Sequence, residues 1–363
     1  MNEAFVRLTT QSLKKENFTL VDVGCSGGIE PAWRTFGDRL KAVGFDASLP
    51  ECRRLEAAET HPNIRYVPGF VDIPRDHPFY KRAEGKPPYT DELFRRFSVS
   101  WSLEMRAKCL AGASHAEKMA HNLWHETELA DQNTPIFVPD ELRKLGTTDV
   151  DFLKIDIDGP DFRVLNSFDG LFAPFGILAA RLEVCMFGDA DDTLHTFHNT
   201  DRFMRQQGYA LIAIEPRTYS MRALPSRYTN TEPAQTVSGR LFLADALYAR
   251  DPAGFEEWKG LADTLSDEKL LKLAAIHSVW SLPDGAADIL VTFRSRLHPL
   301  IDINRALDLL AAQAQPNAAE PLSYRDYMAL FASDSPAFYP PYTPPPRRTV
   351  AQRLLAAWRA LRD

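Results

Sequence analysis

The sequence predicts an α/β fold: a doubly wound, mostly parallel sheet with helices on both faces, followed by a C-terminal helical appendage. Three observations support this prediction. An apolar run ends in a carboxylate and a glycine-rich turn within residues 20–28, short strand-like runs alternate with helical stretches up to residue 250, and strand signals become rare beyond it. Such alternation is typical of a parallel sheet that is covered on both faces.

Composition places the chain among globular proteins without a dominant charge. It has 363 residues, 45% of them hydrophobic, and a net charge of −7, which makes nucleic acid a poor candidate partner. The four cysteines, Cys25, Cys52, Cys109 and Cys185, are scattered and are expected to be reduced thiols. The N-terminal segment lacks the apolar core of a signal peptide, and no run approaches the roughly 18 apolar residues of a membrane-spanning helix. We therefore expect a cytoplasmic protein.

The first strand is predicted over residues 18–23 and leads into a turn with three glycines. Glycines at such a corner let the backbone approach a bulky ligand, and the next helix, predicted over residues 33–40, points its N–H groups at that ligand. Ser26 stands where the second glycine of Gly-x-Gly-x-x-Gly would fall. This departure disfavours a nicotinamide-dependent dehydrogenase.

A second strand, over residues 41–46, ends in Asp46. An α/β nucleotide fold places a carboxylate for the ribose hydroxyls roughly twenty residues beyond the turn, which is where Asp46 lies. A helix cap or a solvated turn is the open alternative for this residue. A helix over residues 50–61 and a strand over residues 64–71 continue the alternation.

Residues 72–132 interrupt the alternation with a proline-rich loop and a helical stretch. A long insertion on a nucleotide fold is often a lid or a substrate-recognition element. Ser100, Trp101 and Ser102 are therefore candidates to line the cofactor or acceptor pocket, with a packing role as the open alternative.

The second informative stretch, residues 149–161, is a buried strand that ends in a cluster of carboxylates before another helix. Ligands of open α/β sheets bind outside the carboxyl ends of the strands, and strand alternation sends Lys154, Asp156 and Asp158 to one face. Several like charges at one place need compensating cations or hydrogen bonds, so we expect Asp156 to be functional. Asp161 is expected to cap the following helix.

The remaining strands are expected over residues 177–186, which carry Arg181 and Glu183, over residues 210–214, and over residues 240–249 as an antiparallel hairpin partner. A helix is expected over residues 200–208. Two groups of side chains have metal-like spacing, but helix-face polarity explains both and no metal site is assigned. They are His121 with His125, and Asp189 and Asp191 with His195 and His198.

Two motifs together resemble the FkbM family of class I S-adenosylmethionine-dependent methyltransferases. They are Val21-Asp22-Val23-Gly24 with its glycine turn, and Asp151-Phe152-Leu153-Lys154-Ile155-Asp156-Ile157-Asp158-Gly159. Further landmarks are Asp140-Glu141-Leu142, Glu183 and Asp245-Ala246-Leu247-Tyr248. The resemblance covers about residues 18–250 and implies a seven-stranded, mostly parallel Rossmann-like sheet with S-adenosyl-L-methionine as the cofactor.

The resemblance also implies a cofactor site. The residues that would surround the methionine portion of the cofactor are Asp22, Gly24, Cys25, Ser26, Gly27 and Gly28. Asp46 would lie at the ribose, and Ser48 would be a further cofactor-binding residue. Asp158 and Asp161 stand where the family usually has glutamate, and Pro160 stiffens the turn between them. These shorter carboxylates imply a different reach to the acceptor.

The expected reaction is methyl transfer to the oxygen of a saccharide or natural-product hydroxyl by in-line displacement. Asp156 is the first candidate for the base that takes the hydroxyl proton, and Asp158 is the second. Lys154 would hold the carboxylates, or act as the base if its pKa were lowered. Glu183 would orient the acceptor, with packing or a salt bridge to Arg181 as the open alternative.

Three other functions are alternatives to this interpretation. A catalytically degenerate methyltransferase fold would serve as a scaffold in a glycan-assembly complex, and the shortened carboxylates favour it. The intact glycine turn argues against that reading. A dehydrogenase is disfavoured as above, and a protein or nucleic-acid methyltransferase is disfavoured because the Asn-Pro-Pro-Tyr type motif is absent after the fourth strand.

We expect a methyltransferase domain over residues 1–250, a helical appendage over residues 251–334, and a proline-rich linker with a basic amphipathic helix over residues 335–363. Helices are predicted at 255–265, 267–277 and 301–314. The appendage would shape the acceptor site or a homodimer contact. The helix at 347–363 would lie on an anionic membrane surface or dock on its own or a neighbouring subunit.

Overall fold

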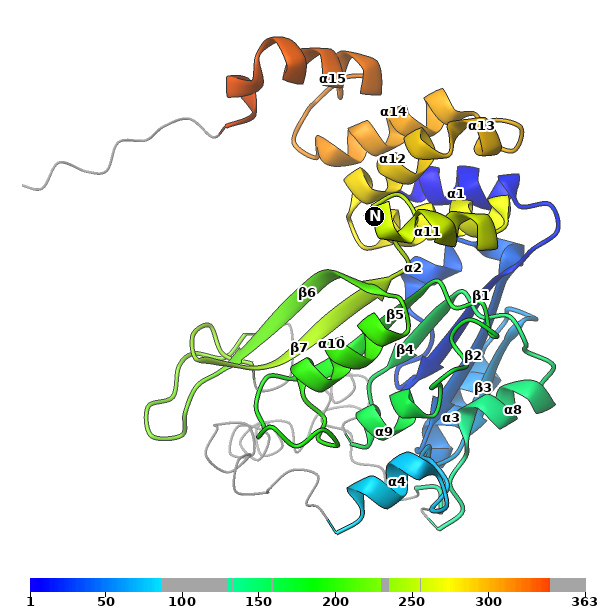
Figure 1. The fold of residues 1–363 in the computed structure, drawn as a ribbon, viewed down its shortest axis with the longest axis vertical. Helices are drawn as coiled ribbons and strands as arrows, with labels where there is room; N and C mark the ends of the chain where they lie inside the picture. Colours follow the sequence, from blue (N-terminus) through cyan, green and yellow to red (C-terminus); the bar gives the residue numbers. More distant parts are fainter. Residues whose placement is uncertain (86–128, 132, 158, 230–234, 255, 340–363) are drawn as a thin grey trace, which may run out of the picture.

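The protein is described by a computed structural model that covers residues 1–363 except for 86–128, 132, 158, 230–234, 255 and 340–363 (Figure 1). Its centre is a seven-stranded sheet with the order β3-β2-β1-β4-β5-β7-β6. The strands are β1 (Phe18–Val23), β2 (Leu40–Asp46), β3 (Ile64–Pro68), β4 (Phe152–Ile155), β5 (Ala179–Cys185), β6 (Ala210–Tyr219) and β7 (Arg240–Ala249). The predicted doubly wound α/β fold is confirmed.

The first five strands are parallel, and β7 is antiparallel to both β5 and β6. The chain builds outward from β1 to β3 and then returns to place β4 on the other side of β1. The reversal of strand order between β1 and β4 creates the crevice at which ligands of such sheets bind. Val23 and Ile155 are register partners there, so the two sequence motifs end side by side.

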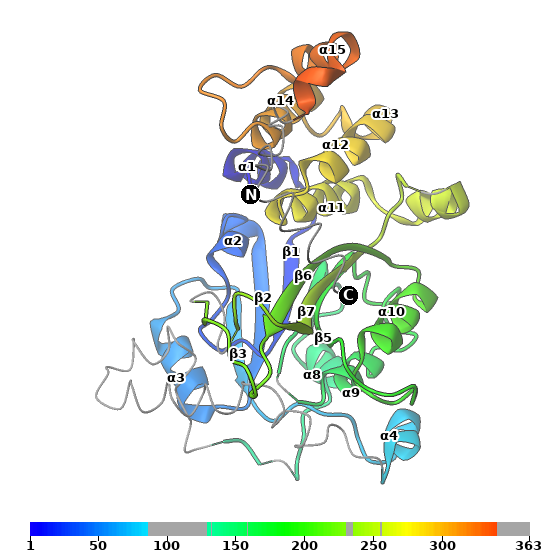
Figure 2. The same ribbon diagram turned by 90° about the vertical axis from the view of Figure 1, so that its left-hand side faces the viewer.

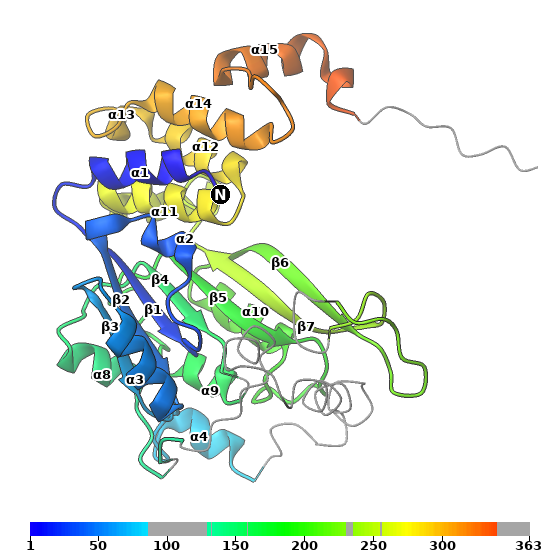
Figure 3. The same ribbon diagram turned by 180° about the vertical axis from the view of Figure 1, so that it is seen from behind.

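Helices cover both faces of the sheet, because successive strand residues point to opposite sides. Val21, Leu153 and Ile155 belong to the core beneath α8 (Val138–Lys144), α9 (Asp161–Asn166) and α10 (Phe197–Gln206). Leu20 and Phe152 belong to the core of the other face. Helix α3 (Leu49–Ala58) lies beside β2 and β3 (Figure 3).

A helical layer lies at the end of the sheet where β1 begins, and α4 (Pro78–Ala83) lies at the opposite end (Figure 1). The layer contains η2 (Glu256–Thr264), α11 (Asp267–Val279), α12 (Pro283–Thr292), α13 (Arg294–Leu297), α14 (Ile303–Ala314), α15 (Tyr324–Ser333) and η3 (Ser335–Phe338). The N-terminal helix α1 (Glu3–Ser12) packs on α11 and α14 (Figure 2). The domain division at residue 250 stays a prediction.

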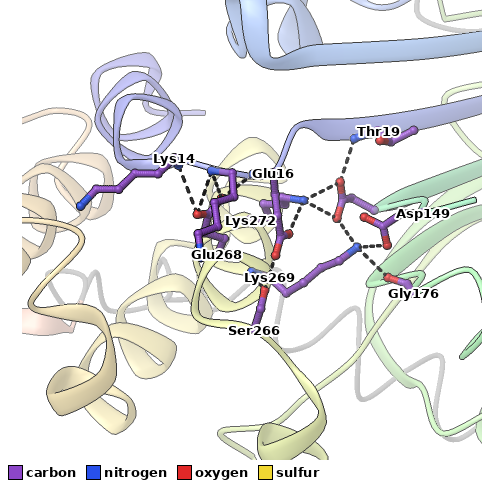
Figure 4. Close-up of polar contacts among 11 residues, drawn as sticks. Lys14, Glu16, Thr19, Asp149, Gly176, Ser266, Glu268, Lys269 and Lys272 are labelled. Carbon is purple, nitrogen blue, oxygen red and sulfur yellow. Dashed lines mark hydrogen bonds and ion pairs between the residues drawn. The ribbon is translucent and has the colours of Figure 1, made fainter. Parts of the chain in front are cut away.

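A buried ion cluster fastens this layer to the amino ends of β1 and β4 (Figure 4). Asp151 accepts a hydrogen bond of 2.8 Å from the Thr19 N–H. The Lys269 ammonium lies 2.7 Å from Asp151, and the Lys272 ammonium bridges Asp151 at 3.1 Å and Glu16 at 2.8 Å. Burial raises the pKa of Asp151 despite both lysines. The cluster joins three chain segments far from the carboxyl edge of the sheet.

The prediction of a continuous helix over residues 33–40 is wrong. The one-turn helix α2 (Pro31–Arg34) is followed by the 3₁₀ turn η1 (Gly37–Arg39), and β2 begins at Leu40. Trp33 and Phe36 stack on Phe18 at centroid distances of 5.4 and 4.0 Å. Packing of these rings fixes the segment, and Gly37 turns the chain with a φ of +51°, a conformation that glycine favours.

Other elements differ from prediction at their ends. Helix α10 begins at Phe197 rather than at residue 200, and β6 continues to Tyr219 rather than ending at residue 214. Helices α12, α13 and α15 were not predicted. Pairing with β7 extends β6 beyond its local preference, and buried residues hold α10.

Several sequence predictions fall outside the described residues. They concern Ser100, Trp101, Ser102, His121, His125, Asp158 and the helix at 347–363. The proposed membrane or subunit contact and the homodimer therefore stay predictions. Among the described residues, no helix has the length and apolar character needed to cross a membrane.

Candidate functional site

The glycine turn after β1 lies directly against the end of β4. Gly24 has a φ of +94°, and a Cβ built on it would lie 1.8 Å from the carbonyl oxygen of Asp156. The Asp156 N–H donates to the Val23 carbonyl at 2.9 Å. No other residue type fits position 24, because any side chain would displace the backbone of β4. The close approach brings the two motifs together although more than a hundred residues separate them.

Lys154 connects the charged groups of both motifs. Its ammonium donates to Asp22 Oδ1 at 3.1 Å and to the Gly24 carbonyl at 3.1 Å, and it lies 3.8 Å from Asp156 Oδ2. Burial opposes the charge, but Asp22 and Asp156 together raise the pKa of Lys154. A protonated lysine holds the carboxylates in place, so the alternative in which Lys154 acts as the base is not supported.

The two carboxylates of this group have different surroundings. The Asp22 side chain is 5% exposed, and burial raises its pKa to about 6 because Lys154, shared with Asp156, compensates only in part. The Asp156 side chain is 27% exposed. Asp156 is therefore the more accessible of the two carboxylates, whereas Asp22 is buried beneath the turn.

Asp46 ends β2 beside the glycine turn, as predicted for the residue at the ribose. Its Oδ1 accepts from the Ser48 N–H at 2.8 Å, and its carbonyl accepts from the Gly69 N–H at 2.8 Å. Ser48 caps α3, because its hydroxyl accepts from the Glu51 N–H at 3.1 Å. The cap is thus Ser48 and not Asp46. The cofactor contacts of both residues stay predictions.

The Cys25 side chain is buried in the core. The thiol is buried against Gly44, where a Cβ would lie 2.7 Å from Sγ, and burial raises the pKa of the thiol. Only the backbone of Cys25 is placed to take part in the turn. Ser26 and Gly27 are exposed at its tip, and their contacts with the cofactor stay predictions.

Asp161 does not cap the helix that it begins, so this prediction is wrong. The N-cap of α9 is Pro160. The Asp161 carboxylate reaches backward and accepts from the N–H groups of Ile157 and Gly159, each at 2.9 Å. These donors follow the end of β4 and have no strand partner, so the carboxylate stabilises the loop after β4 instead of the helix.

A row of charged side chains continues across the same face from β4 to β6. Arg181 of β5 pairs with Glu30 and Asp245, each at 3.0 Å. Arg217 of β6 pairs with Glu183 at 3.1 Å and with Asp245. A salt bridge between Glu183 and Arg181 was one expectation from the sequence; the structure shows Arg217 as a partner of Glu183.

Neither Glu30 nor Arg217 was singled out from the sequence. The residues that they pair with are distant in the chain. Arg217 lies in β6 beyond residue 214, where the strand was predicted to end, so the sequence did not place it in the sheet. Burial opposes the charge, but Asp245 raises the pKa of both arginines, so both guanidinium groups remain charged. Trp280, just beyond α11, lies over Arg181 with 5.2 Å between the guanidinium carbon and the ring centroid.

The acidic loop after β5 is organised by hydrogen bonds within the chain. Asp189 accepts from the Asp191 N–H at 2.8 Å, and Asp191 accepts from the Thr193 N–H at 2.8 Å. A ring nitrogen of His195 lies 2.8 Å from the Glu183 carbonyl. Within the described part of the chain, no group of three or more His, Cys, Asp or Glu side chains is arranged to hold a metal ion.

Part of the chain matches a known protein family. Residues 108–211 match the family model described as the Methyltransferase FkbM domain. The match covers under a third of the chain, includes β4 and β5 with Lys154, Asp156 and Glu183, and begins in residues that the structure does not describe. A search of curated proteins found no match.

Solved structures with detectable similarity include two S-adenosylmethionine-dependent methyltransferases. A TehB-like enzyme from Corynebacterium glutamicum has a TM-score of 0.28 and 10% identity, covering 68% of this chain and 87% of its own. An enzyme from Anabaena variabilis has a TM-score of 0.27 and 9% identity, with 64% and 77% covered. The MccD protein has a TM-score of 0.26 and 9% identity, with 68% and 96% covered.

The sheet itself, with β7 antiparallel between β5 and β6 and a glycine turn after β1, has the class I methyltransferase architecture implied by the sequence motifs. The protein is a methyltransferase that uses S-adenosylmethionine. The domain match over residues 108–211, together with the motif at the end of β4, makes this part of the chain similar to the FkbM methyltransferase domain.

Proposed function

We propose that the enzyme methylates a hydroxyl oxygen of a saccharide or a related natural product. The observation that carries this proposal is the position of Asp156. Its carboxylate is partly exposed at the carboxyl end of β4, and its backbone contacts the turn at Gly24. A carboxylate beside the cofactor turn is placed to take the proton of a weakly acidic hydroxyl as its oxygen is methylated.

The residues described above fit S-adenosylmethionine. The turn at residues 24–28 is shaped by positive-φ glycines, so its backbone approaches a ligand closely. Asp46 provides an acidic side chain at the neighbouring strand end for the ribose hydroxyls. The cofactor supplies an activated methyl group on a sulfonium sulfur.

The protein's contribution to the reaction is positioning and proton transfer. Bound at the turn, the cofactor would supply the methyl group to the acceptor oxygen, and its sulfur would keep the electron pair of the broken carbon–sulfur bond. The hydroxyl proton passes to the carboxylate of Asp156. The Lys154 ammonium, 3.8 Å from Asp156 Oδ2, helps to orient this carboxylate. Alignment of the reacting atoms can itself supply several orders of magnitude in rate.

A polar acceptor is favoured by the charged row beside Asp156. Arg181 and Arg217, held by Glu183 and Asp245, present guanidinium donors and carboxylate acceptors on the same sheet face. Donors and acceptors of this kind suit a molecule with several hydroxyl groups.

The first test is a calorimetric titration with S-adenosylhomocysteine, using the wild-type protein, Asp46→Ala and Asp156→Asn. We expect micromolar binding by the wild type, loss of that binding in Asp46→Ala, and unchanged binding by Asp156→Asn. Transfer of a radiolabelled methyl group to a panel of saccharides and hydroxylated natural products then tests the acceptor class.

The outcomes separate the open alternatives. If the wild-type protein does not bind, the scaffold reading replaces the enzymatic one. If it binds and methylates only amines or carboxylates, the proposed hydroxyl acceptor is wrong while the cofactor assignment stands. Binding by Asp46→Ala that equals the wild type would contradict the placement of the ribose.

A further inference from the structure

The backbone amides of the glycine turn have different hydrogen-bond partners. The N–H groups of Gly24 and Cys25 donate to the Phe45 carbonyl of β2 at 2.9 and 3.1 Å, and the Gly28 N–H donates to the Cys25 carbonyl at 2.8 Å. The Gly27 N–H instead donates to a side chain, Glu51 Oε1, at 3.0 Å. Gly27 lies at the exposed tip with a φ of +83°, so this bond sets the orientation of the tip.

Glu51 comes from the first turn of α3 and is held firmly in place. Its side chain is 1% exposed, and Arg54 binds both of its oxygens at 2.6 and 2.7 Å. The Arg54 side chain is 44% exposed. Charge-assisted bonds of this bidentate kind fix geometry as well as adding energy.

The direction of Glu51 departs from the usual helix-start pattern. Ser48 and Glu51 have the spacing of a capping box, in which the glutamate reaches back to the N–H of the capping serine. Here the Ser48 N–H is already bonded to Asp46 Oδ1 at 2.8 Å. The Glu51 side chain instead reaches across to Gly27.

These bonds form one continuous path between the two halves of the cofactor site. Asp46 accepts from the Ser48 N–H, the Ser48 hydroxyl accepts from the Glu51 N–H, and Glu51 accepts from the Gly27 N–H. We propose that Glu51 is a positioning residue for S-adenosylmethionine, which holds the glycine turn ready for the methionine portion and couples it to the ribose carboxylate.

The physical basis is preorganisation. A glycine-rich tip has many accessible backbone conformations, and binding must otherwise restrict them at a cost in affinity. Glu51 restricts the tip before the cofactor arrives. The inference rests on the cofactor assignment and not on the identity of the acceptor.

The test compares Glu51→Ala, Glu51→Gln and the matched control Asp201→Ala by titration with S-adenosylhomocysteine. Asp201 is also a helix carboxylate paired with an arginine in its own helix, at 2.8 Å from Arg205, but it lies on α10. We expect Glu51→Ala to weaken binding about tenfold or more, the scale of one lost hydrogen bond to a charged group. Glu51→Gln retains an acceptor for the Gly27 N–H and is expected to stay within about threefold of the wild type.

Two further measurements separate positioning from general stability. Hydrogen exchange at residues 24–29 of the cofactor-free protein should become faster in Glu51→Ala and stay unchanged in Glu51→Gln and Asp201→Ala. In a cycle with Ser48→Ala, the two losses of affinity should be less than additive, because both substitutions interrupt one path.

The proposal is overturned if Glu51→Ala folds and binds as tightly as the wild type, or if all three variants lose affinity in proportion to their loss of thermal stability. Failure of the wild type to bind overturns the cofactor assignment, and the Glu51 inference with it. Normal wild-type binding with unchanged exchange in Glu51→Ala overturns the Glu51 inference alone.

Discussion

Replacement of Lys154 by methionine is the most informative perturbation of the site. The substitution preserves most of the volume of the side chain and removes the ammonium that lies 3.1 Å from Asp22 Oδ1 and 3.8 Å from Asp156 Oδ2. Lys154 and Asp22 are 13% and 5% exposed, so water replaces little of the lost interaction.

The expected loss of stability depends on pH. Removal of one partner of a buried ion pair costs about 3–5 kcal/mol of stability. We expect the lower value, about 3 kcal/mol, near pH 8, because Asp22 can become neutral by taking up a proton and then no longer carries an uncompensated charge. Burial already raises the pKa of Asp22 from 3.8 to about 6. Loss of the neighbouring cation raises that pKa further.

The sign of the pH dependence follows from proton binding. Between about pH 4 and 6 the folded wild type holds the Asp22 proton more tightly than the unfolded chain, so the contribution of Asp22 to stability falls as pH rises through this range. In Lys154→Met the pKa of Asp22 is higher, so the contribution of Asp22 to stability continues to fall at higher pH. The raised pKa of Lys154 keeps it charged from pH 5 to 8, so its own titration adds no slope there. The deficit of the variant is therefore smaller at pH 5 than at pH 8.

Urea denaturation at pH 5, 6.5 and 8 measures this deficit for Lys154→Met and for the double variant with Asp22→Asn. The free energy of unfolding of the double variant should vary less between pH 5 and 8 than that of Lys154→Met, because an amide at position 22 does not titrate. A deficit that is equal at all three pH values, or larger at pH 5, would refute the reasoning. So would a double variant with the same pH slope as Lys154→Met.

Three further predictions address the site and the helical layer. Asp156→Asn should bind S-adenosylhomocysteine normally but lower turnover by about 100-fold or more in a radiolabel transfer assay; turnover within threefold of the wild type would exclude Asp156 as the base. Gly24→Ala should lose cofactor affinity and melt at a lower temperature, because its Cβ would lie 1.8 Å from the Asp156 carbonyl oxygen; a Tm equal to that of the wild type would contradict this contact. Lys272→Met should cost about 3–5 kcal/mol in urea unfolding, since it leaves Asp151 and Glu16 without a cation that lies 3.1 and 2.8 Å away; a loss below about 1 kcal/mol would mean that Lys269 alone compensates.

The sequence by itself determined the strands nearest the site. Runs of β-branched and apolar residues bounded by glycine or charged residues predicted β1 and β7 at their observed ends and β2 within one residue. These signals are local, because the side-chain period and the turn chemistry belong to consecutive residues. The two motifs also consist of consecutive residues, so they could be recognised in the sequence. They indicated the class of enzyme and its cofactor.

Only the tertiary structure decided which groups act on one another. Lys154 and Asp22 are far apart in sequence, yet β1 and β4 are neighbours in register, with Asp22 opposite Lys154. Asp161 was expected to cap a helix, but its carboxylate instead accepts hydrogen bonds from N–H groups of the preceding loop. A carboxylate bonds to whichever donors the fold leaves without partners, and that depends on the whole chain.

The aromatic residues after the glycine turn show the same limit. Trp33 and Phe36 read locally as part of a longer helix, but their stacking on Phe18 outweighs that preference, since propensities of a few tenths of a kcal/mol yield to burial of a large ring. Glu51 fits a capping box in sequence and reaches Gly27 in the fold. The sequence thus determined the strands, the turn and the cofactor, because these depend on neighbours along the chain; the ion pairs, the hydrogen-bond path and the exposed carboxylate were decided by packing between distant segments.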